Sequence, residues 1–454
     1  MSRLAQTNPY LSPNILSITT IYLTQGLLSL TSLARTFLLK DSLHLDPSTS
    51  AALGGIFVLP WTVKPLYGIF TDTFRIGGTR RKGYILLAAL GASLSNLGLG
   101  FEGFRGVWGE GREVEVVVFL AVLGSGCIAV TDVVADGIVV EESRKGGGGG
   151  GGGGGISGPN LQSLCWGSAA VGGILSSYSS GALVQEIGPE GVYRYAAFLP
   201  LLVAGVSVFI KEEPVPDVPE KIDNGLAVVG SKLKALKDAF STNDVWKPTL
   251  FLFLWQATPS CDSAFLYFLT DEMHFTTEFL GRVKLVTSVA GLVGVVVYNR
   301  FLKDVPIKDM LKWCSVIGAI LGSTQLILIN HWNTLLGIPD DLFVYGDDVI
   351  LTVLGQVAFM PTLVLAAKLC PVGVEGTLFA LLMSIYNLAG ITGSEIGAGL
   401  TKALNVSSED FSNLALLVSI CNVSSLFPLL FMDKLMGGID EKDDNNDTAD
   451  AEIM

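Results

Sequence analysis

Long apolar stretches recur along the whole chain and alternate with short polar segments. Most of these stretches come close to the ~20 residues that an α-helix needs to cross the hydrocarbon core of a bilayer. The pattern therefore predicts an all-α polytopic membrane protein with about twelve transmembrane helices. The expected spans are residues 15–38, 49–70, 84–101, 116–140, 160–185, 192–210, 249–270, 281–301, 309–329, 345–369, 376–400 and 411–432.

The longest polar segment inside the chain, residues 211–248, divides the expected spans six and six. Two six-helix halves joined by a polar linker are typical of secondary transporters, in which parallel repeats move about a site between them. A short repeat fits this interpretation, since Tyr67 to Phe70 and Tyr298 to Phe301 end corresponding spans. The predicted organisation is an N-terminal segment (1–14), a first half (15–210), a linker (211–248), a second half (249–432) and an acidic tail (433–454).

Basic side chains indicate which way the chain crosses the bilayer. With a cytoplasmic N-terminus, most of the 29 Lys and Arg residues fall in inner segments, as the positive-inside rule requires. Both termini and the linker are therefore expected to be cytoplasmic. The net charge is −13, but a large share of it lies in the tail 433–454, which is too polar to form a core and is expected to be disordered.

Composition and motifs narrow the classes of function. Only 16% of the residues are charged, against roughly 25% in soluble domains. The three histidines, His44, His274 and His331, fall in or near outer loops, and no HExxH or GxSxG motif occurs, so no enzyme is expected. The six cysteines lack CxxC spacing, which argues against a metal site. No cofactor is expected, and no basic tract predicts binding of nucleic acid.

Ten consecutive glycines, Gly146 to Gly155, occupy the inner loop after the fourth span. A phosphate-binding loop would need a following Lys-Ser/Thr pair and a preceding strand, so we interpret the run as a flexible tether. Because no nucleotide-binding loop is present elsewhere, transport is expected to use an ion gradient.

The inner junction after the second span carries a resemblance to a known family. It reads Pro60-Trp-Thr-Val-Lys-Pro-Leu-Tyr-Gly68, followed by Asp72 and by the basic pair Arg80 and Arg81. Gly68, Asp72 and the basic cluster resemble the loop between spans two and three of the major facilitator superfamily. The fuller string is similar to the folate-biopterin transporter family within it. Further similar segments are residues 39–47, 132–141, 161–167, 257–260 and 369–380.

This resemblance covers nearly all of the chain outside the linker and the tail, with departures at Arg75, at Thr79 and in the ten-glycine run. It implies a major facilitator fold and a secondary transporter of folate or a related pteridine that works by alternating access as a proton symporter. The alternative is a transporter of another organic anion or of an unknown solute. A monomer in the plasma membrane or in an organelle envelope, such as that of a plastid, is expected.

The resemblance also assigns a gate. Gly68, Asp72, Arg80 and Arg81 correspond to the superfamily loop, whose charges at the cytoplasmic edge can bridge the two halves in one state and separate in the other.

Ionisable residues inside the spans are candidates for binding the cargo or a proton, because each costs ~2.5–3.5 kcal/mol in a bilayer without a partner. Asp132 and Asp136 lie one turn apart on one helix face. Their mutual repulsion favours a proton carrier, and a carboxylate can accept two hydrogen bonds from a pterin. The structural alternative is that these acids brace the basic loop.

Three polar residues of the first two spans extend this list. Lys64 could pair with Asp136 when the inner gate is shut, or meet a carboxylate of the cargo, or it could snorkel to the headgroups. The guanidinium group of Arg35 can donate two parallel hydrogen bonds to a carboxylate, but Arg35 too could snorkel. Gln25 lies about three turns deeper than Arg35 in the first span.

In the seventh span, Gln256 and Asp262 flank a helix break that is expected at Pro259. Such breaks at membrane depth are tolerated where they line a cavity. Neighbouring aromatic side chains could stack a flat pteridine or face lipid; they are Trp255, Phe265, Tyr267 and Phe268. Glu395 in the eleventh span is a further candidate for which the sequence names no partner.

Overall fold

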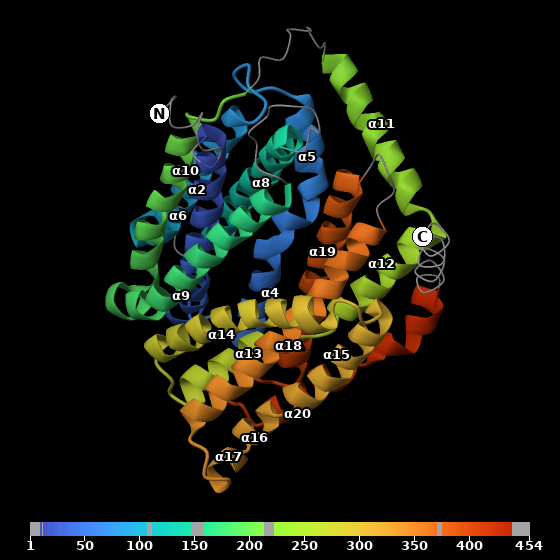
Figure 1. Ribbon diagram of the computed structural model, residues 1–454. Helices are drawn as coiled ribbons and strands as arrows, with labels where there is room; N and C mark the ends of the chain where they lie inside the picture. Colours follow the sequence, from blue (N-terminus) through green and yellow to red (C-terminus); the bar gives the residue numbers. More distant parts are fainter. Residues whose placement is uncertain are drawn as a thin grey trace. The chain divides into compact units, whose positions relative to one another are not determined.

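The computed structural model describes Tyr10 and residues 12–106, 111–146, 158–212, 222–369 and 375–437 (Figure 1). Nearly all of the ten-glycine run, the first nine residues and the acidic tail beyond Gly437 lie outside the described residues. Within the described ranges the chain forms helices, and its one β feature is an isolated bridge between Ile76 and Thr79.

The first half of the chain supplies the helices of the first six expected spans. The element α9 consists of two helices that meet at a kink. The kink lies at Gly188, which has a φ of 72°, and Pro189 follows it in the chain. The elements are α2 (Pro13–Leu28), α3 (Leu30–Phe37), the π-helix η2 (Leu38–Ser42), α4 (Pro47–Val58), the 3₁₀ helix η3 (Leu59–Val63), α5 (Lys64–Thr73), α6 (Lys82–Gly100), α7 (Glu102–Gly106), α8 (Glu113–Gly146), α9 (Gly158–Ala196) and α10 (Phe198–Ser207).

The linker and the second half follow the same scheme. An amphipathic helix, α11 (Ile222–Phe240), occupies the linker. The remaining elements are α12 (Asn243–Gln256), α13 (Asp262–Tyr267), the π-helix η4 (Phe268–Glu272), α14 (Thr277–Val297), the π-helix η5 (Tyr298–Leu302), α15 (Ile307–Gly322), α16 (Gln325–Ile329), α17 (Trp332–Leu335), α18 (Asp340–Lys368), α19 (Glu375–Ala403), α20 (Leu414–Ser424) and the 3₁₀ helix η6 (Phe427–Phe431).

Helices lie at all the span positions that the sequence predicts. Among the described residues, nine helical segments are long and apolar enough to cross a membrane by length and composition. The other expected spans correspond to α9, α10 and the interrupted pair α12 and α13. Many large apolar side chains stay exposed, such as Leu94, Phe119 and Tyr178. A soluble protein would rarely leave so much apolar surface uncovered, whereas a bilayer covers it. The prediction of an all-α polytopic membrane protein is therefore confirmed.

The helices form two compact units, which do not follow the chain order strictly. The first contains residues 1–44, 63–233 and 277–282, and the second contains residues 45–62, 234–276 and 283–454. Thus α4 belongs to the second unit, where it lies beside α19, while α5 belongs to the first (Figure 1).

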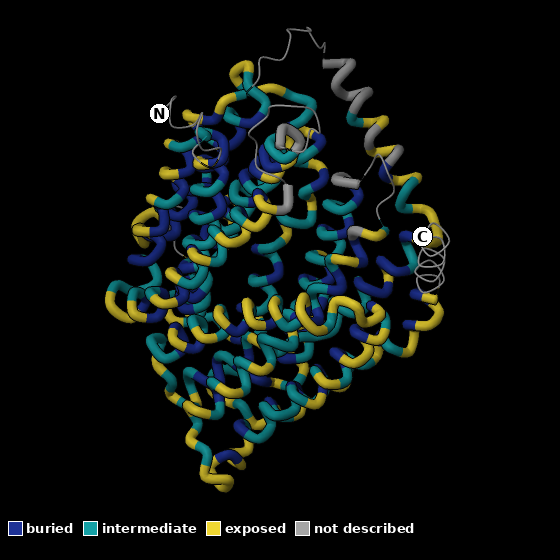
Figure 2. Tube along the Cα trace, in the orientation of Figure 1, coloured by how far each residue is buried: buried dark blue, intermediate teal, exposed yellow. Residues whose placement is uncertain are grey.

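In the first unit, α2, α6, α8, α9 and α10 share an apolar core that includes Ile18, Ile21, Ile85, Val134 and Leu161. Buried positions concentrate along these helices (Figure 2). Small residues let α2 and α9 approach closely: a methyl group added at Gly172 would lie 2.8 Å from the backbone nitrogen of Leu27. Close backbone approach at small residues is typical of helix association in membranes.

In the second unit, the final helical segment extends beyond the predicted span. The span ends at Gly437, so residues 433–437 belong to a helix and not to the tail. Leu435 and Met436 explain the extension, because they are buried against Phe251 and Leu311.

One turn occurs twice in the chain. The first copy, Phe37-Leu-Leu-Lys-Asp-Ser-Leu-His44, contains η2; the second, Tyr267-Phe-Leu-Thr-Asp-Glu-Met-His274, contains η4. Both end in a histidine with left-handed backbone, at φ values of 50° and 55°. A residue other than glycine seldom adopts this conformation. The shared sequence and the shared backbone identify these segments as copies of one motif.

Candidate functional site

Lys64 and Asp132 form an ion pair between α5 and α8. The Lys64 Nζ atom lies 2.5 Å from Asp132 Oδ2, and the two side chains are 19% and 14% exposed. The sequence offered Asp136 as a partner for Lys64, whereas the structure pairs Lys64 with Asp132. The 3₁₀ helix η3 and Pro65 explain the difference, because α5 begins anew at Lys64 and no single straight helix runs through residues 49–70.

Asp136 has a different partner, which sequence reasoning missed. The hydroxyl group of Tyr22 in α2 donates a hydrogen bond to Asp136 Oδ1. Tyr22 is buried, while Asp136 keeps an exposed surface. The two carboxylates of α8 therefore sit in unlike surroundings, one paired with a cation and one hydrogen-bonded to a neutral hydroxyl.

Gln25 lies one turn after Tyr22 on the same face of α2. Its Nε2 atom is buried and has no hydrogen-bond partner in the described part of the chain. An unsatisfied buried donor costs about 1–3 kcal/mol, so this amide is a natural contact for an acceptor atom of a ligand. Arg35 lies further along the chain, half-buried in the last turn of α3.

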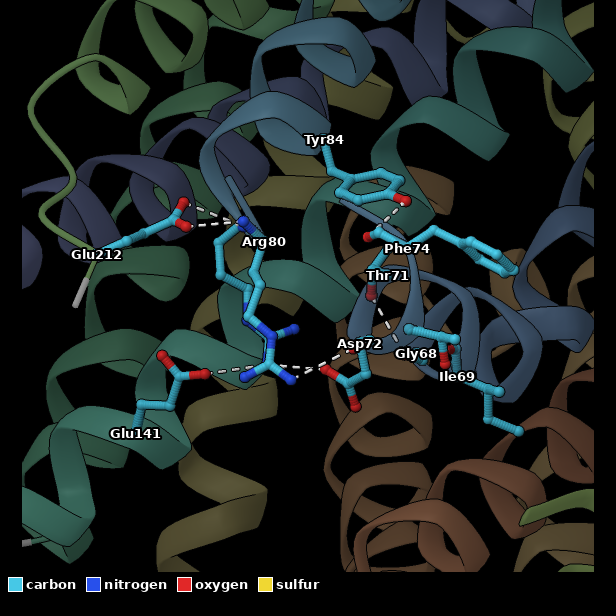
Figure 3. Close-up of polar contacts among 11 residues, drawn as sticks. Gly68, Ile69, Thr71, Asp72, Phe74, Arg80, Tyr84, Glu141 and Glu212 are labelled. Carbon is cyan, nitrogen blue, oxygen red and sulfur yellow. Dashed lines mark hydrogen bonds and ion pairs between the residues drawn. The ribbon is translucent and has the colours of Figure 1, made fainter. Parts of the chain in front are cut away.

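Arg81 is the centre of a charged cluster in the first unit. Its Nη2 atom lies 3.0 Å from Asp72 Oδ1 and 3.1 Å from Glu141 Oε1 (Figure 3). The arginine is only 8% exposed. Its guanidinium group lies over Gly137 of α8, where an added methyl group would be 2.7 Å from Arg81 Cζ. Glu141 and Gly137 were not among the predicted gate residues.

The other predicted gate residues have lesser contacts. Arg80 donates from Nη2 to the backbone oxygen of Asp72 at 3.3 Å. Gly68 contributes its carbonyl oxygen to Thr71, and a methyl group there would meet Val133 at an ordinary 3.6 Å. Space alone therefore does not require glycine at position 68. The positive φ values of Gly77 and Gly78, 59° and 74°, instead form the tight turn of this loop.

The seventh span is broken where the sequence predicts. Helix α12 ends at Gln256 and α13 starts at Asp262, with Pro259 in the gap. The intervening backbone lies against α19: the amide of Ser260 donates to the carbonyl oxygen of Gly393 at 3.4 Å. A methyl group at Gly393 would be 2.5 Å from the carbonyl oxygen of Thr258. Glycine in α19 thus makes room for the break.

The aromatic residues after the break are structural. Phe265, Tyr267 and Phe268 are buried in the second unit. The Tyr267 hydroxyl donates to the backbone oxygen of Leu45 at 2.7 Å and lies 2.8 Å from Ser50 Oγ. These rings therefore face neither lipid nor an open stacking surface. Asp262, by contrast, is exposed at the start of α13.

Two further polar residues of the second unit lie next to glycines. The Nε2 atom of Gln256 would lie 3.5 Å from a methyl group at Gly390 of α19. Glu395 is exposed, and its Oε1 atom would lie 2.8 Å from a methyl group at Gly55 of α4. Gly55 is thus the neighbour of Glu395 that the sequence did not supply.

The fold is shared with solved membrane transporters. A crystal structure of the nucleoside transporter NupG superposes with a TM-score of 0.68 at 12% sequence identity, covering 93% of this chain and 99% of that chain. At this identity the likeness shows the fold: the chain has the helical fold of solved membrane transporters.

Sequence comparison gives the family. The model of the BT1 family matches residues 25–453, and the chain belongs to this family. A folate-biopterin transporter of Synechocystis sp. is 44% identical over 436 residues, which is 96% of this chain and 84% of the relative. A probable folate-biopterin transporter of Arabidopsis thaliana is 30% identical over 446 residues, covering 94% and 86%. The family resemblance predicted from the inner junction is confirmed.

Proposed function

We propose that the protein is a secondary active transporter that moves folate or a related pteridine by alternating access in symport with protons. The names of the Synechocystis and Arabidopsis relatives support this cargo. The observation that carries the proposal is the pair of contacts in the first unit, Lys64 with Asp132 and Tyr22 with Asp136, within otherwise apolar spans.

Lys64 supplies the charge that an anionic cargo needs. Folates carry a glutamate carboxylate, which presents the same oxygen ligands as the side chain of Asp132. The Lys64–Asp132 pair is partly exposed, so a carboxylate of the cargo can reach Nζ and displace Asp132. Without cargo, Asp132 thus occupies the place beside Lys64 that a carboxylate of the cargo takes.

Displacement of Asp132 links the cargo to a proton. An unpaired charge at membrane depth costs ~2.5–3.5 kcal/mol. Protonation of the displaced Asp132 removes this cost, which favours uptake of one proton with one cargo carboxylate. The exposed Asp136, one turn away, provides a second carboxylate through which the proton can pass.

Gln25 and Asp136 offer complementary groups to a pteridine ring. The unpaired Nε2 atom of Gln25 can donate to the ring carbonyl oxygen, and the carboxylate of Asp136 can accept from the 2-amino group and the ring N–H. Tyr22 holds the carboxylate until the ring arrives. Arg35, Gln256 and Asp262 remain candidates for further contacts with cargo.

Alternating access requires parts that move and a gate that closes. In this proposal the six-helix halves, residues 15–210 and 249–432, move about the cargo, and one chain suffices as the transporting unit. Arg81, held by Asp72 and Glu141, anchors the inner gate, with Arg80 and Gly68 in the same loop and helix.

The test is uptake of labelled folate and labelled biopterin by cells that lack their own carriers, with and without a proton gradient. We expect gradient-dependent uptake of at least one of them. Absence of uptake of both, at normal surface expression, would contradict the cargo assignment and favour another organic anion. Uptake that ignores the gradient would contradict proton symport.

Lys64→Gln tests the site itself. Loss of the cation should raise the KM for folate at least about tenfold, as expected when one charge-assisted contact of 1.5–3 kcal/mol is removed. Lys303→Gln, at an exposed position after η5, is the matched control and should transport normally. Equal KM values for the two variants would exclude Lys64 from the cargo site.

A further inference from the structure

The N-terminus of α6 is held by an acidic side chain from a distant part of the chain. The carboxylate of Glu212, the second residue of the linker, accepts hydrogen bonds from the backbone amides of Arg80 at 2.7 Å, Arg81 at 3.0 Å and Lys82 at 2.6 Å. Figure 3 shows the Glu212 carboxylate pointing toward Arg80. The next amide, that of Gly83, donates to Thr79 Oγ1 at 3.0 Å. All four amides, 80 to 83, therefore have acceptors. A carboxylate at this place also meets the positive end of the helix dipole.

The residues around Glu212 are fixed from the other side by α2. Asn14 donates from Nδ2 to the backbone oxygen of Lys211 at 3.0 Å, and its Oδ1 accepts from the Lys211 amide at 2.7 Å. The same Nδ2 group lies 2.8 Å from Glu142 Oε1 in α8. Lys82 Nζ adds a hydrogen bond to the backbone oxygen of Val208 at 2.7 Å. The start of the linker is thus clamped between α2 and α6.

These contacts bear directly on the charged cluster. The amide of Arg81 binds Glu212, while its guanidinium group binds Asp72 and Glu141. Glu212 therefore sets the position of the backbone from which the Arg81 side chain reaches its partners. Thr79, one of the departures from the family pattern, contributes to the same helix start, because its hydroxyl oxygen accepts from the amide of Gly83.

We propose that Glu212 is a positioning residue of the inner gate, and that the start of the linker, residues 211–212, is a latch that keeps Arg81 between Asp72 and Glu141. This inference rests on the gate in the proposed function. When the latch opens, the α6 terminus loses its acceptor, Arg81 loses its fixed backbone, and the gate weakens. The linker is then part of the transport cycle as well as a connection between the halves.

A purely structural cap would act differently. Loss of such a cap would lower the stability of the first unit and the amount of folded protein. Its effect on transport would add to the effect of losing Arg81. A positioning residue that acts through Arg81 should have no further effect once Arg81 is gone, because contacting residues in one network are not additive.

The experiment is a double-mutant cycle on transport of labelled folate by the full-length protein in proteoliposomes. Glu212→Gln and Arg81→Gln are measured singly and together, and Glu186→Gln, at an exposed acid of α9, is the control. Thermal unfolding in detergent is recorded for each protein. Asn14→Ala provides a second way to loosen the latch without touching Glu212.

We expect Glu212→Gln to lower the maximal rate about five- to thirtyfold, a usual size for coupling between sites. Asn14→Ala should act in the same direction, and Glu186→Gln should transport as the wild type does. The Glu212/Arg81 double variant should match Arg81→Gln alone. If the losses in maximal rate of the two single variants multiply in the double variant, or if Glu212→Gln transports at the wild-type rate, the proposal is overturned.

The same measurements separate this inference from the proposed function. If the wild-type protein does not transport folate, the cargo assignment fails; the cycle is then run with biopterin, or with another organic anion that the protein carries. If the wild type transports and Arg81→Gln is also unimpaired, the gate assignment fails and the latch fails with it.

Discussion

Replacing Gly137 by alanine should disable the proposed gate while leaving the fold intact. The added methyl group would lie 2.7 Å from Arg81 Cζ and within 2.9 Å of both terminal nitrogens. Real side chains do not approach so closely, so the guanidinium group must move. Because it is the end of a flexible side chain, it can move without distorting α8, but it then leaves Asp72 and Glu141.

The expected changes in stability and in transport differ enough in size to be measured separately. Alanine stabilises a helix interior by ~1 kcal/mol relative to glycine. The lost contacts are charge-assisted, but Asp72 and Glu141 are 39% and 46% exposed, so each contributes only ~0.5–1 kcal/mol. The two terms nearly cancel, and the melting temperature should change little. Transport should nevertheless fall to the level of Arg81→Gln, because the gate has lost its arginine.

The assay compares uptake rate and thermal unfolding of Gly137→Ala with those of Gly355→Ala. Gly355 lies within α18 and has no atom within 4 Å of an added methyl group, so it reports the helix effect alone. We expect Gly355→Ala to transport normally and to unfold at the same or a slightly higher temperature. If Gly137→Ala transports as well as this control does, the role given to the Arg81 contacts is wrong.

Two further predictions concern other parts of the first unit. Tyr22→Phe removes the hydrogen bond to Asp136 at nearly constant volume, and the profile of uptake against external pH should move; an identical profile would exclude Asp136 from proton coupling. Gly281→Val should lower the melting temperature, because a methyl group there would lie 2.6 Å from the Gly181 Cα atom, and such overpacking costs ~1–3 kcal/mol. Gly205→Val, where nothing lies within 4 Å, is the control, and equal melting temperatures would refute the close approach of Gly281 to Gly181.

The transmembrane architecture could be predicted because it depends on a local property, the length of apolar stretches. The same property placed the end of the last helix too early. Asp433 and Lys434 suggested the start of a tail, but the helix continues because Leu435 and Met436 are buried. That burial is a tertiary contact, which the local pattern does not contain.

The candidate site was predictable as a set of residues and not as a set of pairs. Lys64, Asp132 and Asp136 stand out because charge is costly in apolar spans. Which of the two acids meets Lys64 depends on the direction in which Lys64 projects from α5. The 3₁₀ helix η3, directly before α5, changes that direction from the one that a continuous α-helix would give. Tyr22 gave no signal, because a tyrosine in an apolar span is unremarkable until its hydroxyl group finds a partner.

Glu212 was missed for a different reason. It lies in a polar linker, where an acidic side chain is expected to be solvated. Its partners are the backbone amides of residues 80–82, which are more than 100 positions away and have no side-chain signature. A contact of this kind can be found only from coordinates.

The repeated turn bears on the ancestry of the chain. If the copies ending in His44 and His274 descend from one six-helix ancestor, counting forward from each histidine sets Lys64 against Gly294, and counting back from Tyr67 and Tyr298 sets it against Val295; neither residue is charged. The lysine was therefore gained in one descendant or lost from the other after the gene doubled. The two descendants have since specialised, and an attempt to rebuild a symmetric ancestor would have to choose between a charged and an uncharged version of this position.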